Sequence, residues 1–238
     1  MRPESTVSPS LVAWGNAWLS GHVGLDEAAD QVEAAAGPAV VGELRLREHL
    51  ANLRSDGLRE LRLALPAPGD PLGLSGPPAF NSAALDAGQA VIAVLDGRNL
   101  GLVPHPDLRG SSYSGVRFEV HDAGPVRHDL PSLAEAEREL SAAMRAATEA
   151  LTSVDGPAAD RPGRLGRGGE LAPGYPGRAH RVSTLATRLA AVLRLADSRG
   201  LTSGQLAVRE QALRELDRAV RRALIAAHHA IFEPVSYQ

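Results

Sequence analysis

The sequence lacks both cysteine and lysine, so all 25 of the basic side chains among its 238 residues are arginine. Without a thiol it can form no disulfide, thiolate zinc site or cysteine nucleophile. Without an ε-amino group it can form no Schiff base and no P-loop phosphate site of the Gly-Lys-Ser/Thr type. These absences exclude several large enzyme classes, and we predict that the protein uses no cofactor.

Aromatic residues and long apolar runs are also scarce. Aromatic side chains make up only 3% of the chain, so leucine, valine and alanine must fill the core. The first residues include Glu4 and lack the uninterrupted apolar segment of a secretory signal. No stretch approaches the roughly 18 apolar residues that a membrane-spanning helix needs. We therefore expect a cytoplasmic protein that does not contact a membrane.

The net charge of −3 is unevenly distributed along the chain. Residues 1–155 carry 12 arginines and 21 acids, a net charge of −9, whereas residues 156–238 carry 13 arginines and 7 acids, a net charge of +6. Such an asymmetry fits an anionic partner for the basic part, and it equally fits two oppositely charged parts packing together within one fold.

Apolar periodicity predicts helices first and a sheet after them. Strand-like alternation follows, with Asp96-Gly97 as a hairpin turn and a proline- and glycine-rich loop at 66–80. Such hairpins are typical of a small, mainly antiparallel sheet. The expected helices cover about 11–18, 26–36, 42–55 and 81–86, and the expected strands cover 59–65, 89–95, 100–103 and 115–121.

The remainder is expected to be helical. Ser132 and Glu135 form a capping-box pattern that predicts a helix running to about residue 154, and two more helices are expected at about 178–199 and 203–232. We therefore predict an α+β fold with a helical N-terminal third, a small mainly antiparallel sheet and a C-terminal three-helix bundle. The predicted domains are 1–130 and 131–238, the second with a mobile linker at about 156–177.

Two segments carry a resemblance to known proteins: LALPAPGDPLGLSGPPAFNSAALDAGQAVIA at 63–93 and PGYPGRAHRVSTLATRLAAVLRLA at 173–196. With them, the chain resembles a family of uncharacterised conserved proteins from high-GC actinobacteria over most of its length. The resemblance implies a lineage and a compartment, and it supplies no catalytic residues.

Two His-Asp pairs are the best candidates for metal ligands. Imidazole and carboxylate groups suit Zn²⁺ and other divalent ions, but these pairs fall in an expected glycine- and proline-containing loop. We therefore predict no metal site. The candidate ligands, should the protein bind a metal ion, are His121, Asp122, His128 and Asp129.

A cationic cluster is expected where the last two helices fold back on each other. It could bind a phosphate or an acidic protein surface, or it could be a solvated face held by pairs such as Glu210 with Arg214. Nucleic acid is not expected, because only Tyr175 offers an aromatic ring early in the basic part. The candidate anion-binding residues are Arg178, His180, Arg181, Arg218, Arg221, Arg222 and His228.

Two functional hypotheses follow. The favoured one is a non-enzymatic protein-interaction or adaptor protein, which binds a protein partner or a second copy of itself. The alternative is an enzyme or binding protein for an anionic small molecule, held by the arginine cluster beneath the proline-rich loop. The sequence leaves open whether Trp14 and Trp18 belong to the core or to an interface.

Overall fold

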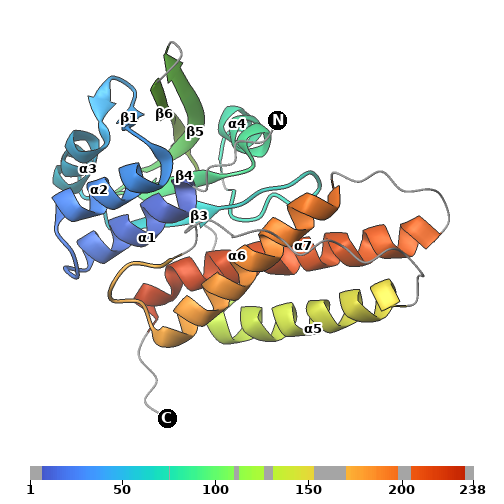
Figure 1. Cartoon of the computed structure of the whole chain (residues 1–238). Helices are drawn as coiled ribbons and strands as arrows, with labels where there is room; N and C mark the ends of the chain where they lie inside the picture. The colour runs from blue at the N-terminus through green and yellow to red at the C-terminus, as the bar shows by residue number, and fades with distance from the viewer. Residues whose placement is uncertain are drawn as a thin grey trace.

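The fold consists of a sheet with helices on both faces and a helical bundle beside it (Figure 1). The structure is a computed structural model that describes residues 7–74, 76–109, 113–125, 131–152, 170–197 and 205–233. Within these ranges the helices are α1 (Val7–Leu19), α2 (Leu25–Ala36), α3 (Leu46–Ser55), α4 (Pro78–Ala87), α5 (Leu133–Thr152), α6 (Gly177–Asp197), α7 (Gln205–His229) and the 3₁₀ turn η1 (Ala230–Phe232).

The sheet is mainly antiparallel, as predicted. Its strand order is β2-β1-β6-β5-β4-β3, and only the β1–β6 pair is parallel. The α+β class, the helical N-terminal third and the C-terminal helices are thereby confirmed. The strands are β1 (Ala39–Val41), β2 (Leu44–Arg45), β3 (Glu60–Ala64), β4 (Ala90–Val94), β5 (Asn99–Arg109) and β6 (Tyr113–Ala123).

Alternation along the strands assigns the helices to the two faces of the sheet. Leu102 of β5 packs in a core shared with α1, α2 and α3, and we call this face of the sheet the inner face. The next residue, Val103, packs with Phe80 of α4 on the opposite, outer face. The outer face is therefore covered by α4 along β3, β4 and the first half of β5.

The bundle is organised around α7. Helices α5 and α6 both pack along α7 and contact each other little, while α7 also packs against β3. The predicted capping box is present: the Ser132 backbone N–H donates to the Glu135 carboxylate at 2.9 Å, and the Glu135 backbone N–H donates to Ser132 Oγ at 3.4 Å. The two tryptophans are half-buried against the core, and Trp14 contacts both the sheet core and the bundle core.

The described part of the predicted linker is packed. Residues 153–169 lie outside the described ranges, but Leu171, Ala172 and Tyr175 are buried in the bundle core just before α6. The Tyr175 hydroxyl donates to the backbone carbonyl of His228 at 3.0 Å, which anchors this segment to the end of α7. Within the described residues, no helix is long and apolar enough to cross a membrane.

Candidate functional site

Arg221 on α7 fastens the proline-rich loop to the bundle. Its Nε donates to Asp217 at 2.8 Å, and its two terminal nitrogens donate to the Leu65 carbonyl and to Asp70 at 2.9 Å each. The side chains of Arg221 and Asp70 are only 14% and 15% exposed. A half-buried guanidinium with three short hydrogen bonds is a structural clamp between the two halves of the chain.

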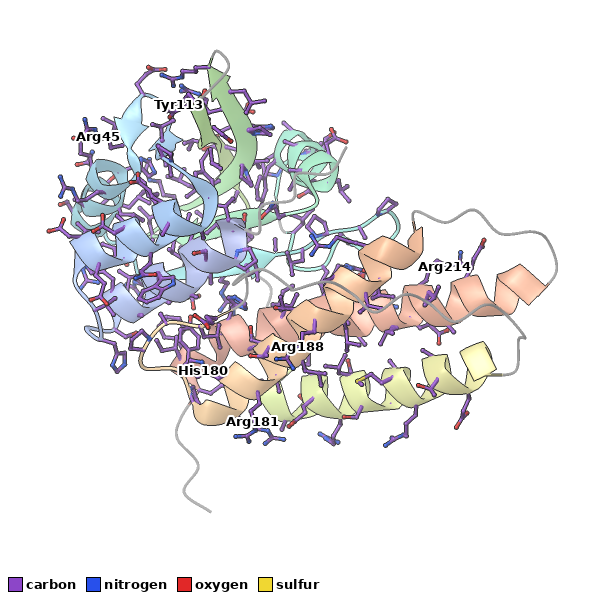
Figure 2. All side chains as sticks on the ribbon, in the orientation of Figure 1. Arg45, Tyr113, His180, Arg181, Arg188 and Arg214 are labelled. Carbon is purple, nitrogen blue, oxygen red and sulfur yellow. The ribbon has the colours of Figure 1, made fainter. Side chains whose placement is uncertain are left out.

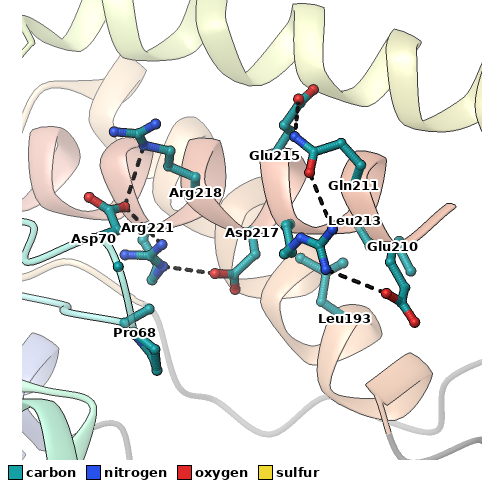
Figure 3. A pocket seen from close by; sticks show the side chains of 13 residues that line it. Pro68, Asp70, Leu193, Glu210, Gln211, Leu213, Glu215, Asp217, Arg218 and Arg221 are labelled. Atoms are coloured by element: carbon teal, nitrogen blue, oxygen red, sulfur yellow. Dashed lines mark hydrogen bonds and ion pairs between the residues drawn. The ribbon is translucent and has the colours of Figure 1, made fainter. Parts of the chain in front are cut away.

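A cavity of about 630 Å³ adjoins this clamp (Figure 3). Its walls come from loop residues 67–70, from the middle of α7 and from Leu193 near the end of α6. This volume lies within the range of small-molecule sites. The lining combines apolar groups with four carboxylates and three guanidinium groups: Asp70, Glu210, Glu215 and Asp217, and Arg214, Arg218 and Arg221.

Each guanidinium at the cavity already faces an acidic partner. Besides the Arg221 bonds, Arg214 lies 3.5 Å from Glu210, and Arg218 lies 3.5 Å from Asp70. Glu215 accepts a hydrogen bond only from the neutral Gln211 amide among the contacts drawn in Figure 3. An anion entering the cavity would therefore compete with carboxylates that are already in place.

The residues of the predicted cationic cluster do not meet at one site. Arg178 pairs with Glu137 of α5 at 2.6 Å, away from the cavity at which Arg218 and Arg221 lie. Arg222 is half-buried, His180 is half-buried on α6, and Arg181 is exposed there. Helices α6 and α7 cross in Figure 2, and their arginines have different partners: Arg178 of α6 pairs with α5, whereas Arg221 of α7 holds the proline-rich loop.

His228, also assigned to that cluster, is buried and unsuited to hold a charge. Its Nδ1 lies 2.7 Å from the Leu224 carbonyl, and burial lowers its pKa to about 4. The neighbouring His229 has an enclosed Nε2 with no hydrogen-bond partner among the described residues. Burial, together with the smaller effect of the nearby positive charge of Arg62, lowers the pKa of His229 to about 3. Both imidazoles are therefore neutral at neutral pH.

The structure separates the described members of the proposed metal-ligand set. His121 and Asp122 are consecutive in β6 and point to opposite faces of the sheet, while His128 and Asp129 lie outside the described residues. Instead, the Glu119 carboxylate lies close to two histidines. His105 Nε2 is 3.3 Å from one carboxylate oxygen, and His121 Nε2 is 3.5 Å from the other. No three metal-ligating side chains within the described ranges are grouped so that they could hold an ion.

Sequence reasoning missed Asp70, Glu119 and His105. No sequence pattern marks Asp70, because water can solvate a carboxylate in a loop, and its pairing with Arg221 depends on how the loop meets α7. Glu119 and His105 required the register of β5 against β6, which pairs Val103 with Glu119 and His105 with Arg117. Neither register nor docking can be read from spacing alone.

The exposed side of α6 carries apolar residues next to arginines. Leu185 is 39% exposed and Val192 is 43% exposed, with Arg181 and Arg188 also exposed on the same helix. The spacing 181, 185, 188 and 192 places all four side chains within about 60° of arc at 3.6 residues per turn. We call these four residues the α6 face. Figure 2 labels Arg181 and Arg188 along this helix.

These features describe an α+β protein with an ion-pair clamp between its two halves and an exposed helical face. The chain belongs to the family of Rv1486c-like proteins: the model of the family's N-terminal domain matches residues 8–132, and the model of its C-terminal domain matches residues 134–225. The predicted membership of an uncharacterised actinobacterial family is confirmed.

Two relatives come from Mycobacterium tuberculosis: "Uncharacterized protein MT1533" of strain CDC 1551 and "Uncharacterized protein Rv1486c" of strain H37Rv. Each is 31% identical over 189 residues, which cover 62% of this chain and 64% of the relative. The match thus spans a little under two thirds of the length of these relatives. No solved structure matches the chain.

Proposed function

We propose that the protein is a non-enzymatic interaction protein and that it docks a protein partner on the α6 face. The observation that carries the proposal is the exposure of Leu185 and Val192, which lie about two turns apart on the same side of α6. Single exposed aliphatic residues are common on protein surfaces, but two on the same side of one helix form an apolar patch, and such a patch favours a contact surface. Arginines beside them are also common in protein interfaces.

The cavity supports the alternative hypothesis less well. Its volume suits a small molecule, but its guanidinium groups are engaged by Asp70, Asp217 and Glu210. Arg221, the most buried of these cations, holds the loop through hydrogen bonds to the Leu65 carbonyl and to Asp70. For these reasons we do not propose an anionic ligand for the cavity.

Site-specific photocrosslinking tests the interaction. The full chain is expressed in a mycobacterial host with p-benzoylphenylalanine at position 185, or at position 108 as the matched control. Leu108 is also an exposed aliphatic residue, but it lies near the tip of the β5–β6 hairpin. We expect an ultraviolet-dependent adduct from position 185 that Val192→Glu removes, and no such adduct from position 108.

The adduct also separates the two kinds of partner. An adduct that contains only this chain identifies self-association, and an adduct that contains a second sequence identifies a separate partner. Equal adducts from positions 185 and 108, or none from position 185, would contradict the proposal. An adduct that persists in Val192→Glu would mean that the contact at position 185 does not extend to Val192, so that the partner does not dock along the α6 face.

A further inference from the structure

The charge on the α6 face narrows the chemistry of its partner; this inference rests on the function proposed above. Helix α6 contains four arginines, at 178, 181, 188 and 194, and its one acid is Asp197 at the last position. Arg178 is neutralised by Glu137 of α5. Arg181 and Arg188 form no ion pair with any residue that the structure describes.

Along α6 the two unpaired arginines alternate with the two exposed aliphatic residues, in the order Arg181, Leu185, Arg188 and Val192. The α6 face therefore presents two aliphatic side chains about two turns apart, beside two positive charges that are also about two turns apart. A complementary surface needs apolar side chains to cover Leu185 and Val192, together with carboxylates that reach Arg181 and Arg188. An amphipathic helix with glutamate or aspartate beside its apolar stripe has this arrangement.

We propose that the α6 face binds an acidic amphipathic segment of another protein. A second copy of this chain fits less well, because a twofold contact through the same face would set Arg181 and Arg188 of one copy against those of the other. Arginine also suits this role chemically, since its planar fork makes two parallel hydrogen bonds to a carboxylate. Charge complementarity of this kind contributes mainly to specificity and to the rate of association.

The test uses a fluorescein-labelled acidic peptide that carries leucines at i, i+4, i+7 and i+11 with glutamates beside them. A peptide of the same composition in scrambled order is its control. Fluorescence anisotropy with the full-length chain should show binding of the first peptide only. Raising the salt concentration should weaken that binding, because salt screens exposed charges.

Charge reversal supplies a matched pair of variants. Arg181→Glu with Arg188→Glu should weaken peptide binding by roughly tenfold or more, since opposed like charges then replace two ion pairs. Arg138→Glu with Arg145→Glu has the same seven-residue spacing on α5, where both arginines are exposed. This control pair should leave the affinity within about twofold, as expected for charges at a distance from the contact.

The inference would be overturned by no binding of the ordered peptide, by equal binding of the scrambled peptide, or by equal weakening by both variant pairs. Binding to phosphatidylserine vesicles, in place of the peptide, would assign the face to a membrane surface and would also overturn it. If Arg181→Glu with Arg188→Glu leaves the crosslink from position 185 intact, the partner is not acidic, but the proposed interaction function stands.

Discussion

At the scale of single residues, Asn16 has the most consequential polar contact of the N-terminal half. Strand β3 is the edge of the sheet, so one side of it has no neighbouring strand. The buried Asn16 amide takes the place of that neighbour: its nitrogen donates to the Leu61 carbonyl and its oxygen accepts the Leu61 N–H, both at 2.8 Å. Gly15 allows this approach, because a Cβ there would overlap the Leu61 side chain.

We predict that Asn16→Ala lowers the free energy of unfolding by about 2–4 kcal/mol, because it leaves a buried N–H and a buried carbonyl without partners. Urea denaturation followed by circular dichroism measures the loss. Asn52→Ala is the control, since Asn52 is exposed on α3, and it should change the stability by no more than about 0.5 kcal/mol. Equal effects of the two substitutions would mean that water replaces the Asn16 amide.

The same scale shows what the sequence could reveal about the site. The residue types were visible, as His121, Asp122 and the C-terminal arginines show, but their groupings were not. Adjacent residues in a strand point to opposite faces, so the His-Asp pair could not act together once it lay in β6. The actual neighbours of His121 come from pairing over the whole length of the hairpin.

At the scale of elements, helices could be predicted well and strand ends poorly. The capping box and the leucine spacing give α5 and α7 nearly as observed. Strand β5 runs to Arg109, beyond the predicted end at Val103, because Pro104 and Pro106 lie where β4 no longer pairs with it. Proline is tolerated on such a free edge, where it also blocks pairing with another chain. The expected helix from residue 42 begins at Leu46, after the short strands β1 and β2.

The contact between the proline-rich loop and α7 gives an element-scale prediction. Arg221→Ala removes hydrogen bonds to Asp217, Asp70 and the Leu65 carbonyl, and it leaves Asp70 half-buried without its closest cation. We expect a loss of about 2–4 kcal/mol of stability, as for breaking one side of a buried ion pair. Urea denaturation measures the loss, and proteolysis of the native protein near residue 70 should become faster.

Arg218 provides the matched control for this substitution. It faces the same Asp70 carboxylate from the same helix, but at 3.5 Å and with 56% of its side chain exposed. Arg218→Ala should therefore cost less than about 1 kcal/mol, the usual size of a surface ion pair. A loss as large as that of Arg221→Ala would show that the network acts through total charge and not through the buried bonds.

At the scale of the whole molecule, α7 belongs to both halves of the chain. Ile225 packs in the sheet core, Val220 and Ala223 pack in the bundle core, and Arg221 holds the loop that follows β3. The opposite net charges of the two halves thus meet in at least one specific contact, the pair of Asp70 with Arg221. The sequence indicates this asymmetry, but it does not identify the contact, because nothing in local spacing pairs residue 70 with residue 221.

The buried His228 and the partly buried His229 lie on α7, the helix that joins the two halves, and they should make the stability of the molecule depend on pH. The pKa values of His228 and His229 are lowered to about 4 and about 3 in the folded chain, mainly by burial. In the unfolded chain a histidine pKa is about 6.5. The neutral imidazoles are thus favoured by folding, so the stability that they allow is fully present above about pH 6.5 and decreases as the pH falls toward the folded values.

We predict that the free energy of unfolding decreases from pH 6.5 to pH 4.5, by up to about 1.4 kcal/mol per pH unit for each of these two histidines. His49, whose pKa is also lowered by burial, adds to the decrease in the same direction. The measurement is urea denaturation at half-unit pH steps in wild type and in His229→Gln. The free energy of unfolding should depend less steeply on pH in His229→Gln than in wild type, whatever the stability of the variant at pH 7. The reason is that glutamine takes up no proton, so the contribution of His229 to the slope is lost. Parallel slopes in the two proteins would mean that His229 is protonated equally in the folded and unfolded chains, and so is open to water when folded.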